Sequence, residues 1–398
     1  MDSPKRFAGL PEYAFPRLRR LLGDVAPGNN NAVEMTIGDP RHAPPAFVAE
    51  VVAEHAAAFM GYPPNDGAPA LLEACADWIF HRYGRRVDPE TEVLALNGTR
   101  EGLYNASMAL CPEEKGGGRP AILTPNPFYQ VYAIAALAVG AEPVYVDATG
   151  ETDHLPDFAG LDPDLLDRTA LVYICSPANP QGAVASMAYW SDLLALAERH
   201  DFTILADECY AEIYRDSPPT GVLEAVEATG ADPDRVVAFH SLSKRSNLAG
   251  LRSGFAVSGP GNIAKLKALR AYSGAPIPLP LQMASAAAWR DEAHVTKNRA
   301  LYAAKFDAAK AILGDIPGVT IPGAGFFLWL PVPETVGDGE AAAVKLWREA
   351  GVKVLPGAYL ARETANGNPG AGYVRVALVA PLDQVASGLT RLRACIYS

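Results

Sequence analysis

The chain has 398 residues (42.1 kDa), with 34 Lys and Arg against 45 Asp and Glu, and a formal net charge of −11. Hydrophobic residues make up 49% and charged residues 20%, which excludes disorder as the main state. An acidic chain repels phosphate unless it has a local basic patch, and the densest basic stretch is residues 17–20. A nucleic-acid scaffold is therefore not expected, and the length suggests about two to three domains.

The five cysteines are scattered, odd in number and without a CxxC pair. This pattern favours neither a disulfide framework nor a zinc cluster, and it fits a reducing compartment. Residues 1–22 show no apolar signal-peptide core, and no run approaches the roughly 20 apolar residues of a membrane span. We therefore predict a cytoplasmic protein, without a metal site because the histidines lack metal-ligand spacing.

The middle of the chain alternates short apolar strands with helical stretches. Because the strands are continuously apolar and joined by helices, they predict a mostly parallel sheet covered on both faces. Ligands of such sheets bind at the carboxyl ends of the strands. One predicted helix ends at residue 110, and two others span 129–139 and 190–199. The predicted strands are residues 93–96, 121–123, 143–146, 171–175, 202–206 and 236–239.

After about residue 285 the pattern changes to that of a smaller α+β domain. We predict a large domain of residues 46–283 and a second unit that combines residues 1–45 with 284–398. The features expected in the second unit are a long charged helix, an apolar stretch, a further helix and another apolar stretch, at residues 291–313, 325–330, 341–350 and 373–378.

Polar side chains gather just after the strand at 236–239. Ser241, Ser243 and Lys244 follow it, and Arg252 comes eight residues after the lysine. Serine hydroxyls and an arginine can hold a phosphate, and a lysine beside them can form a Schiff base with an aldehyde on the same ligand. An isolated Ser-x-Ser-Lys is more often a polar loop with a solvated lysine, so other strand ends must be considered.

Two other strand ends carry suitable partners. Asp207 follows the apolar run 202–206, and a buried carboxylate needs a cation or hydrogen-bond donors. A protonated pyridine nitrogen is such a cation, while a helix cap or a structural ion pair is the alternative. Asn179 follows another buried strand, and Tyr210 lies three residues past Asp207. Both can donate to a phenolate oxygen; the alternatives are an ordinary turn and a core aromatic.

In this order and spacing, the motifs resemble those of the fold type I, class I/II aminotransferases, which use pyridoxal 5′-phosphate (PLP). The resemblance runs from about residue 37 to 375 and implies an α/β protein of the PLP-transferase fold type I. Its mostly parallel seven-stranded sheet would lie in the large domain, beside a smaller α+β domain. Gln181 replaces the family's usual threonine, and this difference affects only the expected geometry of the loop. The matching motifs are Asn179-Pro180-x-Gly182, Asp207-x-x-Tyr210, Ser241-x-Ser243-Lys244 and Arg252.

The resemblance implies a role for each matching residue. Lys244 would hold PLP and carry the proton between substrate and cofactor. Asp207 would pair with the ring nitrogen, Tyr129 would stack on the ring, and Asn179 and Tyr210 would bind its phenolic oxygen. The phosphate would be held by Ser241, Ser243, Arg252, the backbone amides of Thr99 and Arg100, and Tyr62 from the partner subunit of a homodimer.

For the substrate, the resemblance implies that Arg375 binds the α-carboxylate, with help from Asn179 and the backbone of Gly38. The ligands would be amino acids and 2-oxo acids, with no nucleic-acid or membrane partner. In this family the peptide bonds before Pro127 and Pro180 are often cis.

Longer stretches resemble the N-succinyldiaminopimelate aminotransferases, which transfer an amino group between glutamate and N-succinyl-2-amino-6-oxopimelate on the route to lysine. We therefore predict an N-succinyl-L,L-diaminopimelate:2-oxoglutarate aminotransferase. Residues 247–250 and 273–275 depart from the subfamily's usual Asn-Val-Pro-Gly and His-Gly-Cys. The similar stretches are residues 97–101, 128–132, 207–214, 240–247, 289–295, 355–362 and 373–380.

Several alternatives stay open. The chain could act on aspartate, aromatic or other amino acids, or be a PLP-dependent C–S β-lyase; a non-catalytic sensor is disfavoured by the intact Lys244. A doubly acidic substrate needs a second cation besides Arg375, for which Arg41, Arg100 and Arg245 are candidates. Structural roles are expected for the two histidines near these motifs, His240 and His294.

Overall fold

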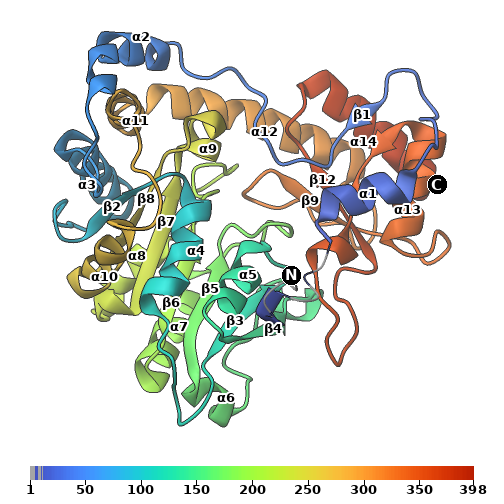
Figure 1. Ribbon diagram of the computed structural model, residues 1–398. Helices are drawn as coiled ribbons and strands as arrows, with labels where there is room; N and C mark the ends of the chain where they lie inside the picture. Colours follow the sequence, from blue (N-terminus) through green and yellow to red (C-terminus); the bar gives the residue numbers. More distant parts are fainter. Residues whose placement is uncertain (1–4, 8–9, 11) are drawn as a thin grey trace.

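Seven strands form the central sheet of the protein, a computed structural model that describes residues 5–7, 10 and 12–398 (Figure 1). The strand order is β2-β8-β7-β6-β5-β3-β4. The remaining residues of the predicted 1–45 segment lie outside this description. The strands are β2 (Val93–Leu96), β3 (Ala121–Asn126), β4 (Glu142–Asp147), β5 (Thr169–Cys175), β6 (Thr203–Asp207), β7 (Val236–Ser241) and β8 (Gly254–Ser258).

The prediction of a mostly parallel seven-stranded sheet is confirmed. The pairs that β3, β4, β5, β6 and β7 form with one another are parallel, whereas β8 runs antiparallel to β2 and β7. The sequence analysis did not predict β8, whose residues directly follow the polar segment around Lys244. Gly254 of β8 pairs with Ser241 of β7, so the segment between them is a loop that leaves the sheet and returns to it at the same edge.

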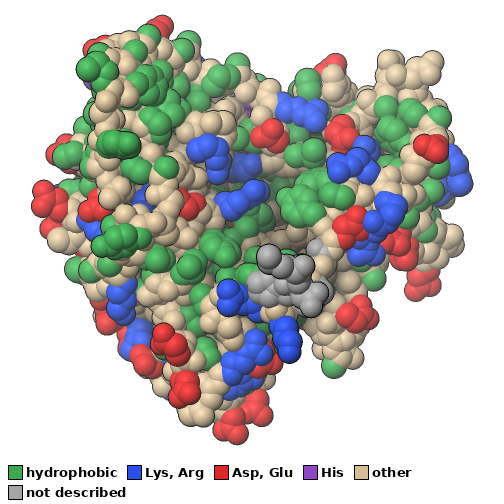
Figure 2. Space-filling model, in the orientation of Figure 1, with side chains coloured by type: hydrophobic (Ala, Val, Ile, Leu, Met, Phe, Trp, Pro, Cys, Tyr) green, Lys and Arg blue, Asp and Glu red, His purple; other side chains and the backbone are tan. Residues whose placement is uncertain are grey.

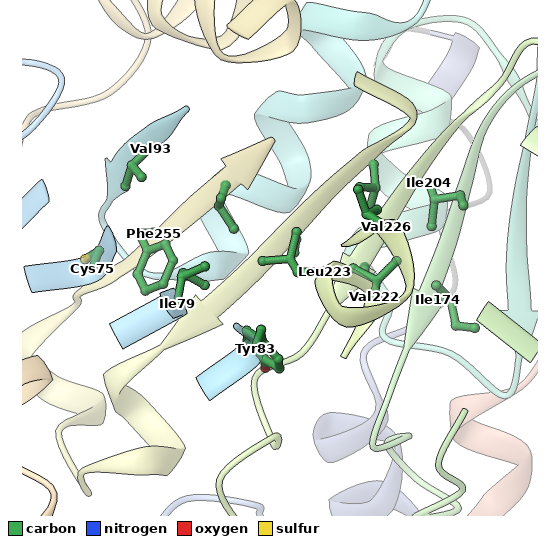
Figure 3. Packing of buried hydrophobic residues seen from close by; sticks show 14 of the residues in the cluster. Cys75, Ile79, Tyr83, Val93, Ile174, Ile204, Val222, Leu223, Val226 and Phe255 are labelled. Atoms are coloured by element: carbon green, nitrogen blue, oxygen red, sulfur yellow. The ribbon is translucent and has the colours of Figure 1, made fainter. Parts of the chain in front are cut away.

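Both faces of the sheet are covered, which explains why its strands are continuously apolar. In β2, Val93 and Ala95 face one hydrophobic cluster, and Leu94 and Leu96 face the other. Figure 3 shows the first cluster, where Ile79 and Val222 pack among the sheet residues. The helices on that face are α2 (Phe47–Glu54), α3 (Pro69–Tyr83), α6 (Pro163–Asp167), α7 (Met187–His200), α8 (Val222–Thr229) and α11 (Leu279–Arg290); those on the other are α4 (Thr99–Leu110), α5 (Val131–Ala138) and α10 (Pro260–Arg270).

The C-terminal third forms a separate hydrophobic cluster that includes part of the N-terminal segment. Val33 pairs with Val352, so the strand near residue 33 joins the C-terminal elements. The long helix α12 (Ala293–Leu313) packs against α14 and connects the two parts of the molecule (Figure 1). Its predicted range is confirmed within two residues; the predicted division at residues 46 and 283 stays a prediction. The elements of this part are α1 (Ala14–Leu22), β1 (Val33–Glu34), β9 (Phe327–Pro331), α13 (Gly339–Lys345), β10 (Val352–Lys353), β11 (Leu355–Pro356), β12 (Tyr373–Ala377) and α14 (Leu382–Ile396).

None of the helices in the described residues combines the length and the apolar character that crossing a bilayer requires.

A buried polar group lies just past β6. The Glu208 carboxylate accepts hydrogen bonds from the backbone N–H of Val222 at 2.6 Å and from the Tyr83 hydroxyl at 2.9 Å. Burial raises the pKa of Glu208 to about 7 and lowers the pKa of His240, whose Nε2 lies 3.6 Å away, to about 3. Both side chains are therefore neutral in mildly acidic solution.

This burial predicts a pH-dependent stability. The unfolded chain ionises Glu208 near its ordinary pKa of 4.5, so the folded state loses stability as the pH rises from 4.5 to about 7. Glu208→Gln carries a neutral isostere and escapes that loss. We expect the melting temperature of Glu208→Gln minus that of wild type, measured by calorimetry, to rise as the pH goes from 4.5 to about 7 and then to level off. A difference that stays constant across the window would contradict the prediction.

Candidate functional site

The predicted site residues converge on a cavity of about 410 Å³ between the carboxyl ends of the parallel strands and the C-terminal part. Figure 2 shows a hollow in the middle of this face, with Lys and Arg side chains around it. Although the protein is acidic overall, it places positive charge around this cavity, where an anionic ligand would bind. The predicted residues that line the cavity are Gly38, Thr99, Arg100, Tyr129, Asn179, Asp207, Tyr210, Ser241, Ser243, Lys244, Arg252 and Arg375.

Tyr62 is the one predicted site residue outside this lining. It lies between α2 and α3 and is fully exposed, beside the exposed Met60 and the half-exposed Phe59. Its predicted role concerns the cavity of a partner subunit, and that role stays a prediction.

One end of the cavity is built to hold an anion. The Ser241 hydroxyl caps the short helix α9 (Leu242–Arg245) by accepting the N–H of Ser243 at 3.1 Å. The Arg252 guanidinium donates to two backbone carbonyls and lies against Gly98, where a Cβ would approach its Nη2 to 2.3 Å. Gly98 also has φ 77°, so glycine is required there. Thr99 begins α4, and its helix N-terminus adds free N–H groups.

Asp207, the last residue of β6, is a buried carboxylate held by neutral donors. It accepts the Tyr132 hydroxyl at 2.8 Å and the backbone N–H of Cys209 at 3.3 Å. Burial raises its pKa, and these hydrogen bonds oppose the rise. A protonated ring nitrogen would supply the missing opposite charge. Tyr132 was not predicted as a site residue; its position one helical turn after Tyr129 is the signal that was available.

Lys244 reaches the cavity from α9. Its ammonium donates to the backbone carbonyl of Gly38 at 2.6 Å and lies 5.3 Å from the Phe326 ring centroid. Burial lowers its pKa to about 8, so a substantial fraction of the amine is unprotonated in weakly alkaline solution. An amine in that state is the nucleophile that a Schiff base requires.

Arg375, in β12, carries a buried positive charge at the cavity. It is 4% exposed and donates to the Asn179 side-chain carbonyl at 2.8 Å and to the backbone carbonyl of Thr36 at 2.7 Å. Both partners are neutral, and Nε has no hydrogen-bond partner among the described residues. Burial lowers its pKa to about 10. A carboxylate ligand would compensate this charge with a bidentate pair.

The structure distinguishes the three candidate arginines for a second carboxylate. Arg100 lines the cavity and donates to the Tyr129 hydroxyl at 2.6 Å. Arg245 packs on the Trp289 ring, pairs with Glu292 and does not line the cavity, and Arg41 does not line it either. Arg100 is therefore the candidate that a cavity ligand could reach.

The peptide bonds before Pro127 and Pro180 are cis, as expected, and so is the bond before Pro177. All three lie at strand ends on the cavity side of the sheet.

These residues fit PLP. The anion-holding end suits its phosphate, Asp207 suits its ring nitrogen, and Lys244 suits its aldehyde. Tyr129 provides an aromatic wall on the same cavity.

Comparisons with known proteins agree with this fit. Residues 30–388 match the family model for aminotransferase class I and II. An LL-diaminopimelate aminotransferase of Dehalococcoides mccartyi is 33% identical over 402 residues, covering 98% of each chain. An aminotransferase structure from Neisseria meningitidis has a TM-score of 0.93 at 37% identity and covers 98% of this chain and 99% of its own. A Thermus thermophilus structure described as a probable N-succinyldiaminopimelate aminotransferase has a TM-score of 0.83 at 26% identity, over 96% of this chain and 100% of its own.

Proposed function

This chain belongs to the class I and II aminotransferases and depends on PLP, and from that premise we propose that it transfers the amino group of N-succinyl-L,L-diaminopimelate to 2-oxoglutarate. Besides Arg252, which we assign to the phosphate, two cavity arginines have no carboxylate partner among the described residues, and they are the observation that carries the proposal: Arg375 for the reacting α-carboxylate and Arg100 for a carboxylate farther along the substrate. The sequence stretches shared with the N-succinyldiaminopimelate aminotransferases add to this support.

The other site residues act on the cofactor and the proton in this proposal. Bound PLP supplies an electron sink that makes the substrate α-hydrogen acidic. Asp207 keeps the nitrogen of the PLP ring protonated, and Asn179 and Tyr210 bind the phenolic oxygen of the same ring. Lys244 holds the cofactor and then moves the α-proton at its Nζ. Ser241, Ser243, Arg252 and the N-terminus of α4 anchor the phosphate.

The charge of the cavity favours an acylated substrate over free diaminopimelate. Among the described lining residues the one carboxylate is Asp207, which we assign to the ring nitrogen. The distal ammonium of LL-diaminopimelate, the substrate named for the Dehalococcoides relative, would therefore meet cationic groups without a carboxylate partner. Succinylation removes that positive charge and adds a carboxylate, which suits Arg100.

We also propose a homodimer with a shared site, two domains divided near residues 46 and 283, and a cytoplasmic location. Exposed apolar side chains support the dimer: Met60, two residues before Tyr62, is 93% exposed, and Tyr272 is 94% exposed. In the dimer Tyr62 would reach the partner's phosphate site.

Arg100→Gln tests the substrate assignment. We expect kcat/KM for N-succinyl-L,L-diaminopimelate to fall by about 10- to 100-fold, since a charge-assisted hydrogen bond to a carboxylate contributes about 1.5–3 kcal/mol. The value for alanine, which has no distal carboxylate, is expected to change little. Arg86→Gln is the matched control, because Arg86 is also exposed and lies over an aromatic ring, Phe80, outside the cavity. Equal losses for both substrates in steady-state kinetics would contradict the assignment.

A further inference from the structure

A chain of hydrogen bonds, buried at Asn298 and Lys305 and half-buried at His42, lies behind Lys244 and ends on its main chain. The Lys305 ammonium contacts His42 Nε2 at 2.7 Å, and His42 Nδ1 contacts the Asn298 side-chain oxygen at 2.9 Å. The Asn298 side-chain nitrogen donates to the backbone carbonyls of Lys244 and Arg245, both at 3.2 Å. Asn298 is 4% exposed and Lys305 is 2% exposed.

The geometry fixes the direction of every hydrogen bond in this chain. Two carbonyls can only accept, so the Asn298 nitrogen faces them and its oxygen accepts from His42. The His42 proton therefore sits on Nδ1, and Nε2 accepts from the Lys305 ammonium. Burial and the nearby Lys305 charge lower the pKa of His42, in agreement with a neutral imidazole. Burial, followed by the charge of Arg41, lowers the pKa of Lys305 to about 8.

Asn298 satisfies carbonyls that α9 leaves free. A four-residue helix has no later turn to bond its last carbonyl oxygens, and these belong here to Lys244 and Arg245. The chain then leaves the helix through Asn247, whose φ is 55° and whose side-chain nitrogen also donates to Asn298, at 3.0 Å. The Asn298 amide thus uses both its hydrogens and both its lone pairs.

The same N-terminal segment also contacts the other end of Lys244. Gly38, four residues before His42, accepts the Lys244 ammonium. A second path runs through rings, because Tyr302 lies 4.6 Å from the His42 ring and stacks on Phe326, which lies beside the ammonium. The charged and titratable groups around this region are Lys305, Arg41 and Asp39, together with Asp291, His294 and Lys297, which line a cavity with His42 and Asn298.

We propose that Asn298, held in place by His42 and Lys305, is a positioning residue that fixes the main chain of Lys244 while its Nζ moves between the cofactor and the substrate α-carbon. This inference rests on the proposed role of Lys244. Reaction geometry is sensitive to such support, because a displacement of about 1 Å in a catalytic group can cost on the order of a hundredfold in rate.

Asn298→Asp tests the proposal, because it keeps the shape and the acceptor while removing the two donated hydrogen bonds. Asn262→Asp is the matched control: Asn262 is also 4% exposed, and its side-chain nitrogen donates to the backbone carbonyl of Asp234 and the hydroxyl of Ser258, outside the cavity. The readouts on the holoenzyme are the pH midpoint of the bound cofactor's absorbance change, kcat and KM. His42→Phe is the second variant, since it keeps a ring against Tyr302 and removes both hydrogen bonds.

We expect Asn298→Asp to raise the absorbance midpoint by about half a pH unit or more, because a loosened Lys244 is better solvated and burial depresses its pKa less. We expect kcat to fall by about 10- to 100-fold with a smaller change in KM. His42→Phe is expected to shift both in the same direction by less, and Asn262→Asp to keep the wild-type midpoint.

A midpoint that stays at the wild-type value in both Asn298→Asp and His42→Phe would overturn the positioning role. If Asn298→Asp does not fold, the midpoint of His42→Phe decides alone. If the absorbance of the bound cofactor is the same in Lys244→Ala as in wild type, the role of Lys244 is overturned, and the positioning role with it. The two failures are therefore distinguishable.

Discussion

Lys244→Ala is expected to lower the transamination rate by roughly 10⁴-fold or more, because the variant loses both the amine that holds the cofactor and the group that moves the α-proton. The lysine is the one primary amine among the described residues that line the cavity, so no neighbour can replace it. Steady-state kinetics with a coupled assay for glutamate formation measures the loss.

Two controls separate this chemistry from charge and folding. Lys244→Arg restores a cation at the same position but not a primary amine, so it is expected to remain as inactive as Lys244→Ala. Lys297→Ala removes an exposed lysine of α12 outside this cavity and is expected to keep wild-type activity. Turnover by Lys244→Ala at the rate of Lys297→Ala would contradict the assignment.

Asp207→Asn is expected to lower kcat by about 10²- to 10³-fold, the range seen when one preorganised electrostatic group is removed. The amide keeps the shape of the carboxylate and one acceptor oxygen for the donors Tyr132 and Cys209, but it cannot hold a proton on the ring nitrogen by charge. The absorbance of the bound cofactor and kcat are measured together.

Glu208→Gln is the matched control for Asp207→Asn. Glu208 is the next residue, is equally buried and also becomes an amide, but it faces Val222 and Tyr83 rather than the cavity. We expect Glu208→Gln to keep wild-type kcat, while its stability relative to wild type rises with pH between 4.5 and about 7. Equal losses of kcat in the two variants would contradict a specific role of Asp207 in the reaction, because a buried carboxylate outside the cavity would then matter as much.

The sequence predicted those parts of the site that depend on local pattern. Asp207 and Lys244 follow apolar strands, and the ends of parallel strands share one edge of a sheet, so their convergence follows from the strand pattern alone. The strand β8 was missed because its five residues follow a polar segment with no distinct turn signal of its own.

Other features depend on contacts between segments far apart in the chain. Asn298 lies 54 residues from Lys244, and Val33 pairs with Val352; neither contact leaves a periodic signal. The same holds for the second arginine. Arg245 is excluded by Trp289 of α11 and by Glu292, which precedes α12, so the sequence alone left Arg100 as one of three equal candidates.

The most direct test of the proposed function is the half-reaction of the purified PLP enzyme, followed by the absorbance of the bound cofactor. N-succinyl-L,L-diaminopimelate, LL-diaminopimelate, L-glutamate and L-aspartate are added in parallel without a 2-oxo acid. We predict rapid loss of the visible band with the succinylated compound and with glutamate, and little change with the other two. Loss of the band with free LL-diaminopimelate or aspartate alone would contradict the substrate assignment, and the absence of any visible band would contradict the role of Lys244.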